Sequence, residues 1–196
     1  LQSISGQRLP VLREVDQEME QKCSFRLEPV HGLVTAREFL MKLADDTMFC
    51  TQYIRHHSKP EFTPEPDIVH EILGHVPMFT HAPLREFSRM IGRAARLATE
   101  EQMVFLNRLY WFTVEFGLIE ENGQIKAFGA GLLGGIQDLR NAFEGGALIK
   151  PFDLSKVIHT DYNYSFNQPV FFVIPSLDTL IEETGKFLQA QQLLTN

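Results

Sequence analysis

The chain has few cysteines, no block of basic residues and no long apolar run. Cys23 and Cys50 are the only cysteines among 196 residues, too few for a disulfide framework or a cysteine-based zinc site. The longest purely apolar stretch, Val170 to Ile174, is far shorter than the roughly 20 residues that cross a bilayer. The first residues show no basic-then-apolar signal peptide. These absences predict a cytoplasmic protein with no membrane span.

The charge balance is mildly acidic. A net charge of -7, without any block of Lys or Arg, argues against nucleic acid or an anionic membrane as the main partner and favours a small-molecule substrate. A composition that is 44% apolar and 22% charged suits one globular domain with a substantial core. We therefore expect residues 1–196 to form a single domain, which begins at Leu1 and can be part of a longer protein. The sequence does not indicate an oligomeric state.

Four segments combine helix-capping residues with apolar side chains at helical spacing. They run from Pro10 to Cys23, from Thr35 to Asp46, from Thr99 to Gly117 and from Ser176 to about Gln191. Pro10 is expected in the first turn of its helix, and Thr35 forms a capping box with Glu38. The pair Asn122-Gly123 predicts a short hairpin, and the residues from Gln168 to Ile174 predict a strand. We expect a mainly helical α+β fold with short strands.

The segment HEILGH, from His70 to His75, resembles the zinc-protease motif H-E-x-x-H but has one residue too many. On an α-helix, residues five apart are separated by about 140°. The two rings cannot then reach one ion if the helix runs through both. We expect Gly74 to end the helix in a left-handed conformation, with Pro77 preventing its extension, so that His75 returns toward the ion from a loop.

A third ligand is sought among the carboxylates, and Glu115 stands out. It lies in the apolar segment LYWFTVEFG, where a buried charge needs a partner; that partner is a metal ion, an arginine or water. With His70 and His75 it forms the two-histidine, one-carboxylate triad typical of non-heme Fe(II) oxygenases. A zinc hydrolase, with Glu71 as general base and Glu115 as third ligand, is the alternative that the extra residue disfavours.

Three longer segments carry a more specific signal. TQYIRHHSKPEFTPEPDIVHEILGHVPMF, LYWFTVEFGL and FGAGLL resemble catalytic-domain motifs of the pterin-dependent aromatic amino acid hydroxylases, which act on phenylalanine, tyrosine or tryptophan. The similarity extends from about Leu9 to QPVFFVIPS. It implies a helical catalytic domain with an iron site in a central cleft, without the family's leading helices and without a regulatory or tetramerisation segment.

The resemblance implies a monooxygenase that uses Fe(II), tetrahydrobiopterin (or a related tetrahydropterin) and O₂ to hydroxylate the ring of an aromatic amino acid. Phenylalanine, converted to tyrosine, is the first choice. Trp111 is similar to the residue of the phenylalanine and tyrosine enzymes, whereas the tryptophan enzymes tend to carry Phe there. The segment TDYNYSFNQP, where substrate preference is partly set, matches none of them well, so Tyr162 and Tyr164 are expected to reshape the pocket.

Individual residues also gain roles from the resemblance. The iron ligands it implies are His70, His75 and Glu115. Arg55 would hold the substrate carboxylate through its planar fork of donors, and the remaining substrate contacts would be Thr63, Pro66, Trp111, Phe116 and Gly131. The pterin contacts would be Gly32, Leu33, Val34, Phe39, Glu71 and Tyr110, with Phe39 stacking on the pterin ring. Glu71 would orient the pterin through water.

Two departures from the family pattern qualify these roles. Phe49 stands where the family commonly has a pterin-contacting His, and Gly134 and Gly135 stand where it commonly has Ser-Ser. The first serine hydroxyl supports an iron-ligating His, and losing such a hydrogen bond lowers metal affinity or activity roughly 10- to 100-fold. Either His70 is supported differently here or the activity is reduced or altered. A catalytically silent relative that only binds a pterin or an amino acid is therefore a second alternative.

Overall fold

The computed structural model of the chain describes residues 1–4, 8–61, 63, 65–164 and 167–194. The α-helices of this part are α1 Leu12–Cys23, α2 Ala36–Leu43, α3 Val76–Phe79, α4 Ala82–Leu97, α5 Glu100–Tyr110, α6 Ala130–Gly134, α7 Ile136–Phe143, α8 Leu154–Val157 and α9 Leu177–Ala190. The strands are β1 Arg26–Pro29, β2 Thr47–Cys50, β3 Leu118–Glu121, β4 Gln124–Ala127, β5 Leu148–Pro151 and β6 Val170–Ile174. There are two π-helical turns. The first, η1 His70–His75, continues into α3, and the second, η2 Trp111–Glu115, follows α5.

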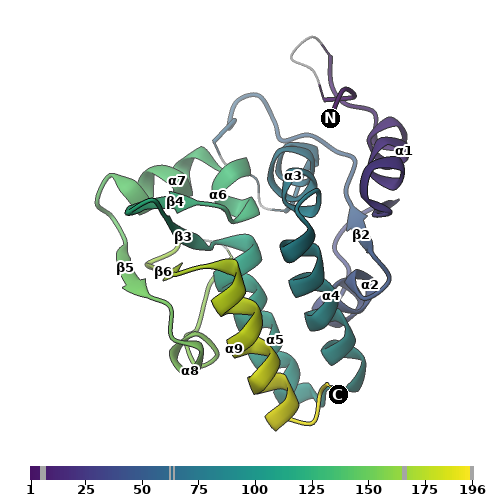
Figure 1. Cartoon of the computed structure of the whole chain (residues 1–196). Coiled ribbons are helices and arrows are strands. Elements are labelled where there is room, and N and C mark those ends of the chain that lie inside the picture. Colours follow the sequence, from purple (N-terminus) through teal and green to yellow (C-terminus); the bar gives the residue numbers. More distant parts are fainter. Residues whose placement is uncertain (5–7, 62, 64, 165–166, 195–196) are drawn as a thin grey trace.

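The long helices α4, α5 and α9 lie side by side and form the body of the molecule (Figure 1). On one side α2 packs against α4, next to the two-stranded parallel pair β1-β2. On the other side stands a four-stranded mixed sheet of order β4-β3-β6-β5, near which α6 and α7 lie. This arrangement confirms the mainly helical α+β fold. Within the described residues, no helix is long and apolar enough to span a membrane.

Local capping chemistry sets several helix starts as predicted. Thr35 and Thr99 each open a helix with a capping box, α2 and α5 respectively, and Ser176 caps α9 by accepting from the Thr179 N–H. The prediction for Pro10 was wrong, because α1 begins at Leu12 with Val11 as its N-cap and Pro10 precedes the first turn. Side-chain caps of this kind satisfy amide groups that the helix leaves unpaired.

The strands follow the prediction in part. Asn122 and Gly123 have φ values of 54° and 72°, which a two-residue hairpin turn requires, and they join the antiparallel strands β3 and β4. The predicted strand at Gln168 begins only at Val170. The second predicted helix ends at Leu43 rather than Asp46, and the chain turns there into β2. Strands β1, β2 and β5 were not predicted.

The core lies between α4, α5, α9 and β6. Its fully buried large side chains include Phe87, Ile91, Leu106, Leu109, Phe172 and Leu180. Each such side chain stabilises the fold by about 1.5–3 kcal/mol relative to exposure to water. A second cluster under the sheet joins Phe116, Leu118, Leu132, Ala142 and Phe171. This second cluster holds α6 and the end of η2 in fixed positions beside the sheet.

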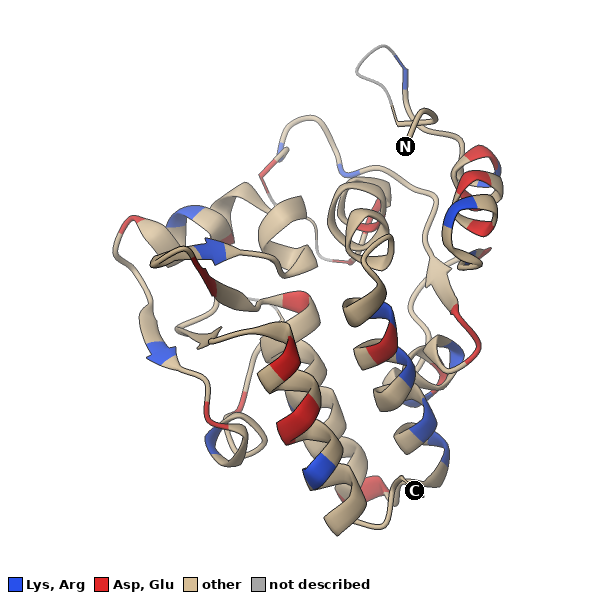
Figure 2. Ribbon diagram, in the orientation of Figure 1, with Lys and Arg blue, Asp and Glu red and all other residues tan. Residues whose placement is uncertain are grey.

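Charged residues of both signs occur along the ribbon, and most of the charged positions of α4 are basic (Figure 2). Two arginines of α4 are paired, Arg89 with Asp46 at 2.7 Å and Arg96 with Asp45 at 2.6 Å. Surface pairs of this type contribute about 0–1 kcal/mol each. These pairs offset part of the positive charge of α4.

Candidate metal centre and adjoining cleft

The helix that carries His70 does not stop before His75, so the prediction that Gly74 ends it was wrong. Residues His70–His75 form the π-helical turn η1, the Val76 N–H bonds to the Glu71 carbonyl, and α3 follows without a break. A π-helical turn bonds residue i to residue i+5, which brings residues five apart onto one face. The histidine spacing is thus explained by a widened turn. Gly74 is not among the residues with positive φ.

Gly74 and Gly134 are instead required by the close approach of α6 to η1. A Cβ on Gly74 would lie 2.6 Å from the Ala130 carbonyl oxygen, and a Cβ on Gly134 would lie 2.8 Å from the His70 Cα. Real Cβ atoms essentially never approach a non-bonded atom this closely, and the neighbours here are backbone atoms, which cannot rotate away. The backbone of His70 is therefore held by direct packing of α6. The position of Gly134 has no room for a serine side chain in this arrangement.

The turn η2 presents Trp111 and Glu115 from the end of α5. The Phe116 N–H bonds to the Trp111 carbonyl five residues back at 2.8 Å. Thr113 supports the widened turn, since its hydroxyl donates to the Leu109 carbonyl at 2.6 Å. Threonine hydroxyls often satisfy helix carbonyls in this way. Both groups of predicted ligands thus lie on π-helical turns.

Three side chains that can bind a metal meet between η1 and η2. The Nε2 atoms of His70 and His75 lie 3.0 Å apart, one Glu115 carboxylate oxygen lies 3.0 Å from His75 Nε2, and the other lies 3.5 Å from His70 Nε2. Ligands about 2.1 Å from one ion lie about 3.0–3.4 Å apart. These spacings suit ligands of a single ion. The set therefore fits a divalent ion with open positions.

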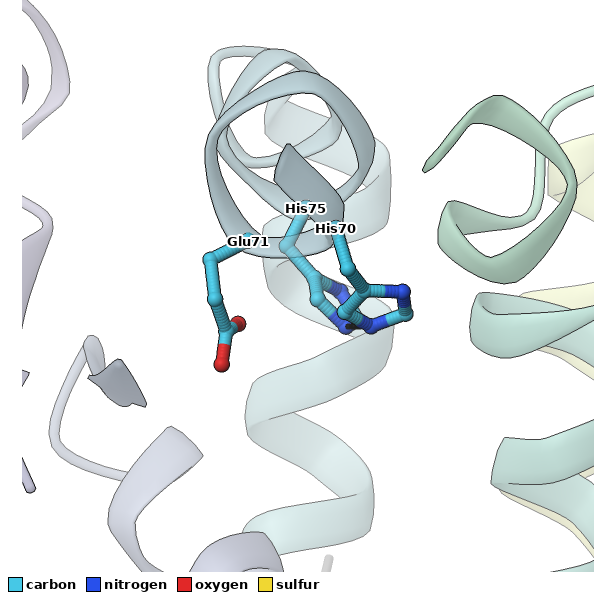
Figure 3. Close-up of side chains that lie close together, drawn as sticks. All are labelled: His70, Glu71 and His75. Carbon is cyan, nitrogen blue, oxygen red and sulfur yellow. Dashed lines mark hydrogen bonds between the residues drawn. The ribbon is translucent and has the colours of Figure 1, made fainter. Parts of the chain in front are cut away.

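Glu71 is also near the two histidines, and its carboxylate lies within 4.8 Å of their ligand atoms. Figure 3 shows that this carboxylate points to one side of the two rings. One of its oxygens accepts from the Thr51 N–H at 3.3 Å and from the Thr51 hydroxyl at 3.2 Å. Glu115 lies closer to both rings and is the better third ligand. Glu71 is therefore a carboxylic acid that lines the cleft beside the candidate metal ligands.

The electrostatics of the centre suit metal binding. Burial lowers the pKa of His70 to about 4, although Glu115 opposes the shift, so its ring is neutral and able to ligate at pH 7. Burial also lowers the pKa of His75, but the adjacent Glu115 outweighs it and raises that pKa. Burial raises the pKa of Glu115, yet the two histidines lower it overall. A metal ion would compete with a proton for the His75 ring. Burial raises the pKa of Glu71 to about 7.

Arg55 is fixed beside the metal centre by a buried ion pair with Asp67. Its Nε and Nη2 atoms donate to the two carboxylate oxygens at 2.8 and 2.7 Å, and the side chains are 8% and 0% exposed. Burial raises the pKa of Asp67, but hydrogen bonds from Arg55 and the His70 N–H lower it overall. The Nη1 donors lie toward the Pro60 carbonyl at 3.3 Å. Asp67 thereby links the guanidinium to the start of the ligand-bearing turn.

A cleft of about 510 Å³ opens over the centre. Its walls include fourteen of the predicted site residues: Gly32, Leu33, Val34, Phe39, Arg55, Thr63, Pro66, His70, Glu71, Tyr110, Trp111, Glu115, Phe116 and Gly131. His75 lies behind them, 1% exposed. The structure thus brings the whole predicted set together, while the role of each residue stays a prediction.

The cleft has two ends. The metal end consists of His70, His75 and Glu115. The aromatic end consists of Trp111, Phe116 and Tyr162: the rings of Trp111 and Tyr162 stack at 4.2 Å and those of Trp111 and Phe116 lie 4.7 Å apart. Farther along the wall, Phe39 and Tyr110 meet edge to face at 5.7 Å. Phe49, where a His was expected, also lines the cleft with Lys42 over its ring at 5.5 Å.

Some residues of the site were not predicted as such. Asp67 accepts from the His70 N–H at 3.0 Å, and its pairing with Arg55 has no local signal in the sequence. Asp138 and Gln168 also line the cleft, and the pKa of Asp138 is raised by burial. No local pattern in the sequence marks Asp138 as a cleft residue.

The chain is similar in sequence to a known protein family. The model of the biopterin-dependent aromatic amino acid hydroxylases matches residues 2–193. A tyrosine 3-monooxygenase of Schistosoma mansoni is 39% identical over 94% of this chain and 40% of its own length. A phenylalanine-4-hydroxylase of Bos taurus is 43% identical over 91% of this chain and 40% of its own length. The chain thus spans about two fifths of these relatives.

Among solved structures, a phenylalanine hydroxylase of Chromobacterium violaceum with bound iron(III) and 7,8-dihydrobiopterin is similar to this chain. The TM-score is 0.87 at 26% identity, covering 95% of this chain and 69% of that one. That protein holds its iron and its oxidised cofactor in the same overall fold.

Proposed function

Because the chain belongs to the biopterin-dependent aromatic amino acid hydroxylases, we propose that it hydroxylates the ring of an aromatic amino acid, with phenylalanine converted to tyrosine as the preferred reaction. Fe(II), a tetrahydropterin and O₂ are the cofactors and co-substrate of the proposal. The observation that carries it is the meeting of the His70 and His75 rings and the Glu115 carboxylate at the cleft, with 3.0–3.5 Å between their nearest nitrogen and oxygen atoms. A zinc hydrolase is not favoured by this family membership.

The metal end would hold Fe(II) through the two Nε2 atoms and the Glu115 carboxylate. When bound, ferrous iron and a reduced pterin supply the activation of O₂, which amino acid side chains cannot provide. The protein contributes fixed ligand positions: His70 through the packing of α6 on its backbone, and Glu115 through the widened turn η2. The cleft adjoins these ligands, so further ligands of the ion would reach it from there.

The substrate would be held at both of its ends. Arg55 is oriented by Asp67. Its Nη1 carries two N–H groups, and the one that does not donate to the Pro60 carbonyl would bind the amino acid carboxylate. The ring would lie among Trp111, Phe116, Pro66 and the His70 ring, with Thr63 and Gly131 along its backbone. Gly131 leaves room for Phe116, because a Cβ there would lie 2.6 Å from the Phe116 Cζ. These apolar walls exclude water from the ring and fix its approach to the metal end.

The pterin would occupy the other wall of the cleft. Phe39 would stack on its ring, and the backbone of Gly32, Leu33 and Val34 would bond to its polar edge. The Tyr110 hydroxyl is buried and has no hydrogen-bond partner among the described side chains and backbone. A buried hydroxyl of this kind needs a polar partner, and a pterin or its bound water can supply one. Glu71 would orient the pterin through water.

Phenylalanine is preferred over tyrosine in the proposal because the aromatic end is lined by Trp111, Phe116 and the stacked Tyr162. Additional bulk at Tyr162 and Tyr164 favours the smaller ring. The relatives bear the names of both activities, so turnover of the two amino acids has to be compared directly.

The experiment is product analysis with purified protein and each amino acid in turn. Tyrosine should form from phenylalanine only when Fe(II), tetrahydropterin and O₂ are all present, and Glu115→Gln should reduce formation to background. Glu101→Gln, an exposed position on α5, is the control and should match the unmodified chain. Product without pterin would contradict the proposal. Normal ligand binding without oxygen consumption would instead identify a silent relative.

A further inference from the structure

Gln168 is a buried amide between the sheet and the aromatic end. It is 1% exposed and stands two residues before β6. The carbonyl of the next residue, Pro169, accepts from the Leu148 N–H of β5 at 2.9 Å. The sheet therefore fixes the backbone at Gln168, and the side chain projects toward the cleft from a rigid base.

Each polar group of Gln168 has a partner. Its side-chain oxygen accepts from the Trp111 indole N–H at 3.0 Å, and its side-chain nitrogen donates to the Asn163 carbonyl at 2.9 Å. Its backbone N–H donates to the Asp138 carboxylate at 3.1 Å, and its carbonyl accepts from the Asn141 amide at 2.7 Å. One residue thus joins η2, α7 and the segment before β6.

The two side-chain bonds end on parts of the same wall. Trp111 lines the cleft, and its ring stacks on Tyr162 at 4.2 Å and 15°. Asn163 follows Tyr162, and Tyr164, which is 75% exposed, also lines the cleft. The segment 162–164 is therefore attached to Trp111 twice, by ring stacking and through the Gln168 amide. An indole N–H has only one direction in which it can donate, so this bond fixes the direction of the N–H, and the stacking on Tyr162 fixes the ring plane.

We propose that Gln168 is a positioning residue, whose amide fixes the Trp111 indole and the segment 162–164 relative to each other and so sets which aromatic amino acid the cleft prefers. It acts through Trp111 and Tyr162 and does not touch the reacting atoms. The inference rests on the proposed function, because the preference concerns that substrate class. A merely structural amide would change stability when lost and leave the preference as it was.

The chain offers a spectroscopic probe, since Trp111 is its only tryptophan. Its fluorescence reports directly on the ring that Gln168 holds, and titration with phenylalanine or tyrosine gives both dissociation constants without turnover. Gln168→Met keeps the length of the side chain and removes the hydrogen bonds to Trp111 and Asn163. Gln124→Met, at an exposed position of β4, is the matched control. Circular dichroism checks that both variants fold.

In Gln168→Met the Trp111 emission should shift toward that of a water-exposed indole. The dissociation constant for phenylalanine should rise by up to about tenfold, the effect of one lost hydrogen bond, and the ratio of the tyrosine to the phenylalanine constant should fall toward one. In steady-state turnover, KM should change more than kcat. Gln124→Met should match the unmodified chain. Unchanged emission and an unchanged ratio in Gln168→Met would overturn the proposal.

Gln168→Glu separates the two bonds, because it keeps an oxygen for the indole and loses the donor to Asn163. It should retain the original Trp111 emission while the ratio falls part of the way. If Gln168→Met does not fold, this variant decides alone, and an unchanged ratio with unchanged emission overturns the proposal. If the unmodified chain binds both amino acids without turning them over, the proposed function fails while the binding ratio still tests Gln168. If it binds neither, both fail.

Discussion

The metal end and the aromatic end of the cleft are held by different kinds of contact. At the metal end, backbone packs on backbone: α6 lies so close to η1 that a Cβ on Gly134 would stand 2.8 Å from the His70 Cα. At the aromatic end, side chains hold side chains, as in the bond from the Trp111 indole to Gln168 at 3.0 Å. Backbone packing tolerates almost no change in size, whereas a side-chain hydrogen bond can be exchanged with a modest cost.

Under the proposed function, this difference would separate chemistry from selectivity. The metal end would hold the ion, so a disturbance there should lower activity for every substrate. The aromatic end would select the ring, so a disturbance there should change preference. Substitutions at the two ends can test whether the separation holds.

The largest effect is expected from Gly134→Ala. The new Cβ collides with the His70 backbone, so α6 or η1 has to move, and overpacking of this kind costs about 1–3 kcal/mol. Iron affinity should fall roughly 10- to 100-fold, as when the support of a ligand is disturbed, with an equal loss of turnover for phenylalanine and tyrosine. Anaerobic titration with Fe(II) measures the affinity.

Gly185→Ala on α9 is the control for this substitution. A Cβ there would lie 3.8 Å from the Met90 Sδ, an ordinary contact. Alanine in a helix interior is more favourable than glycine by roughly 0.5–1 kcal/mol, so the control should keep its iron affinity and gain stability. Unchanged iron affinity in Gly134→Ala would show that η1 does not depend on the close approach of α6.

An intermediate effect is expected from Asp67→Asn, between the two ends. It leaves the Arg55 guanidinium buried without its carboxylate partner, and loss of one partner of a buried pair costs about 3 kcal/mol. The free energy of unfolding should fall by about that amount, and KM for the amino acid should rise more than kcat falls, because Arg55 loses its orientation. Denaturant unfolding and steady-state kinetics give the two values.

Asp161→Asn should have the smallest effect and serves as the comparison pair. Asp161 pairs with Arg108, but its side chain is 89% exposed, and exposed pairs contribute about 0–1 kcal/mol. Equal losses of stability in Asp67→Asn and Asp161→Asn would contradict the view that burial makes the Arg55 pair important.

The candidate ligands could be named from the sequence because each has a chemical signal. His70 and His75 stand close together, and Glu115 is a carboxylate in an apolar segment. The capping boxes at Thr35 and Thr99 were also predictable, because a capping box depends on residues three apart. These features depend on residues that are close together in the sequence, so the sequence alone can reveal them.

The turn between the histidines could not be predicted in the same way. A spacing of five allows either a helix that stops or a turn that widens, and residues 70–75 fit both. Ala130 and Gly134 decide between them from another segment, by packing α6 on η1. Gln168 was likewise expected only to begin a strand. Its bond to Trp111 joins residues 57 positions apart, and a local sequence pattern does not reveal such a contact. Helix α4 was not predicted, although its buried residues recur at helical spacing.

Anaerobic Fe(II) titration followed by nitric oxide, with detection by electron paramagnetic resonance, tests directly whether His70, His75 and Glu115 bind one ferrous ion and leave positions open for other ligands. We expect one iron per chain and a half-integer-spin iron-nitrosyl signal that is absent in Glu115→Gln. No bound iron, or an unchanged signal in Glu115→Gln, would show that these residues do not form such an iron site.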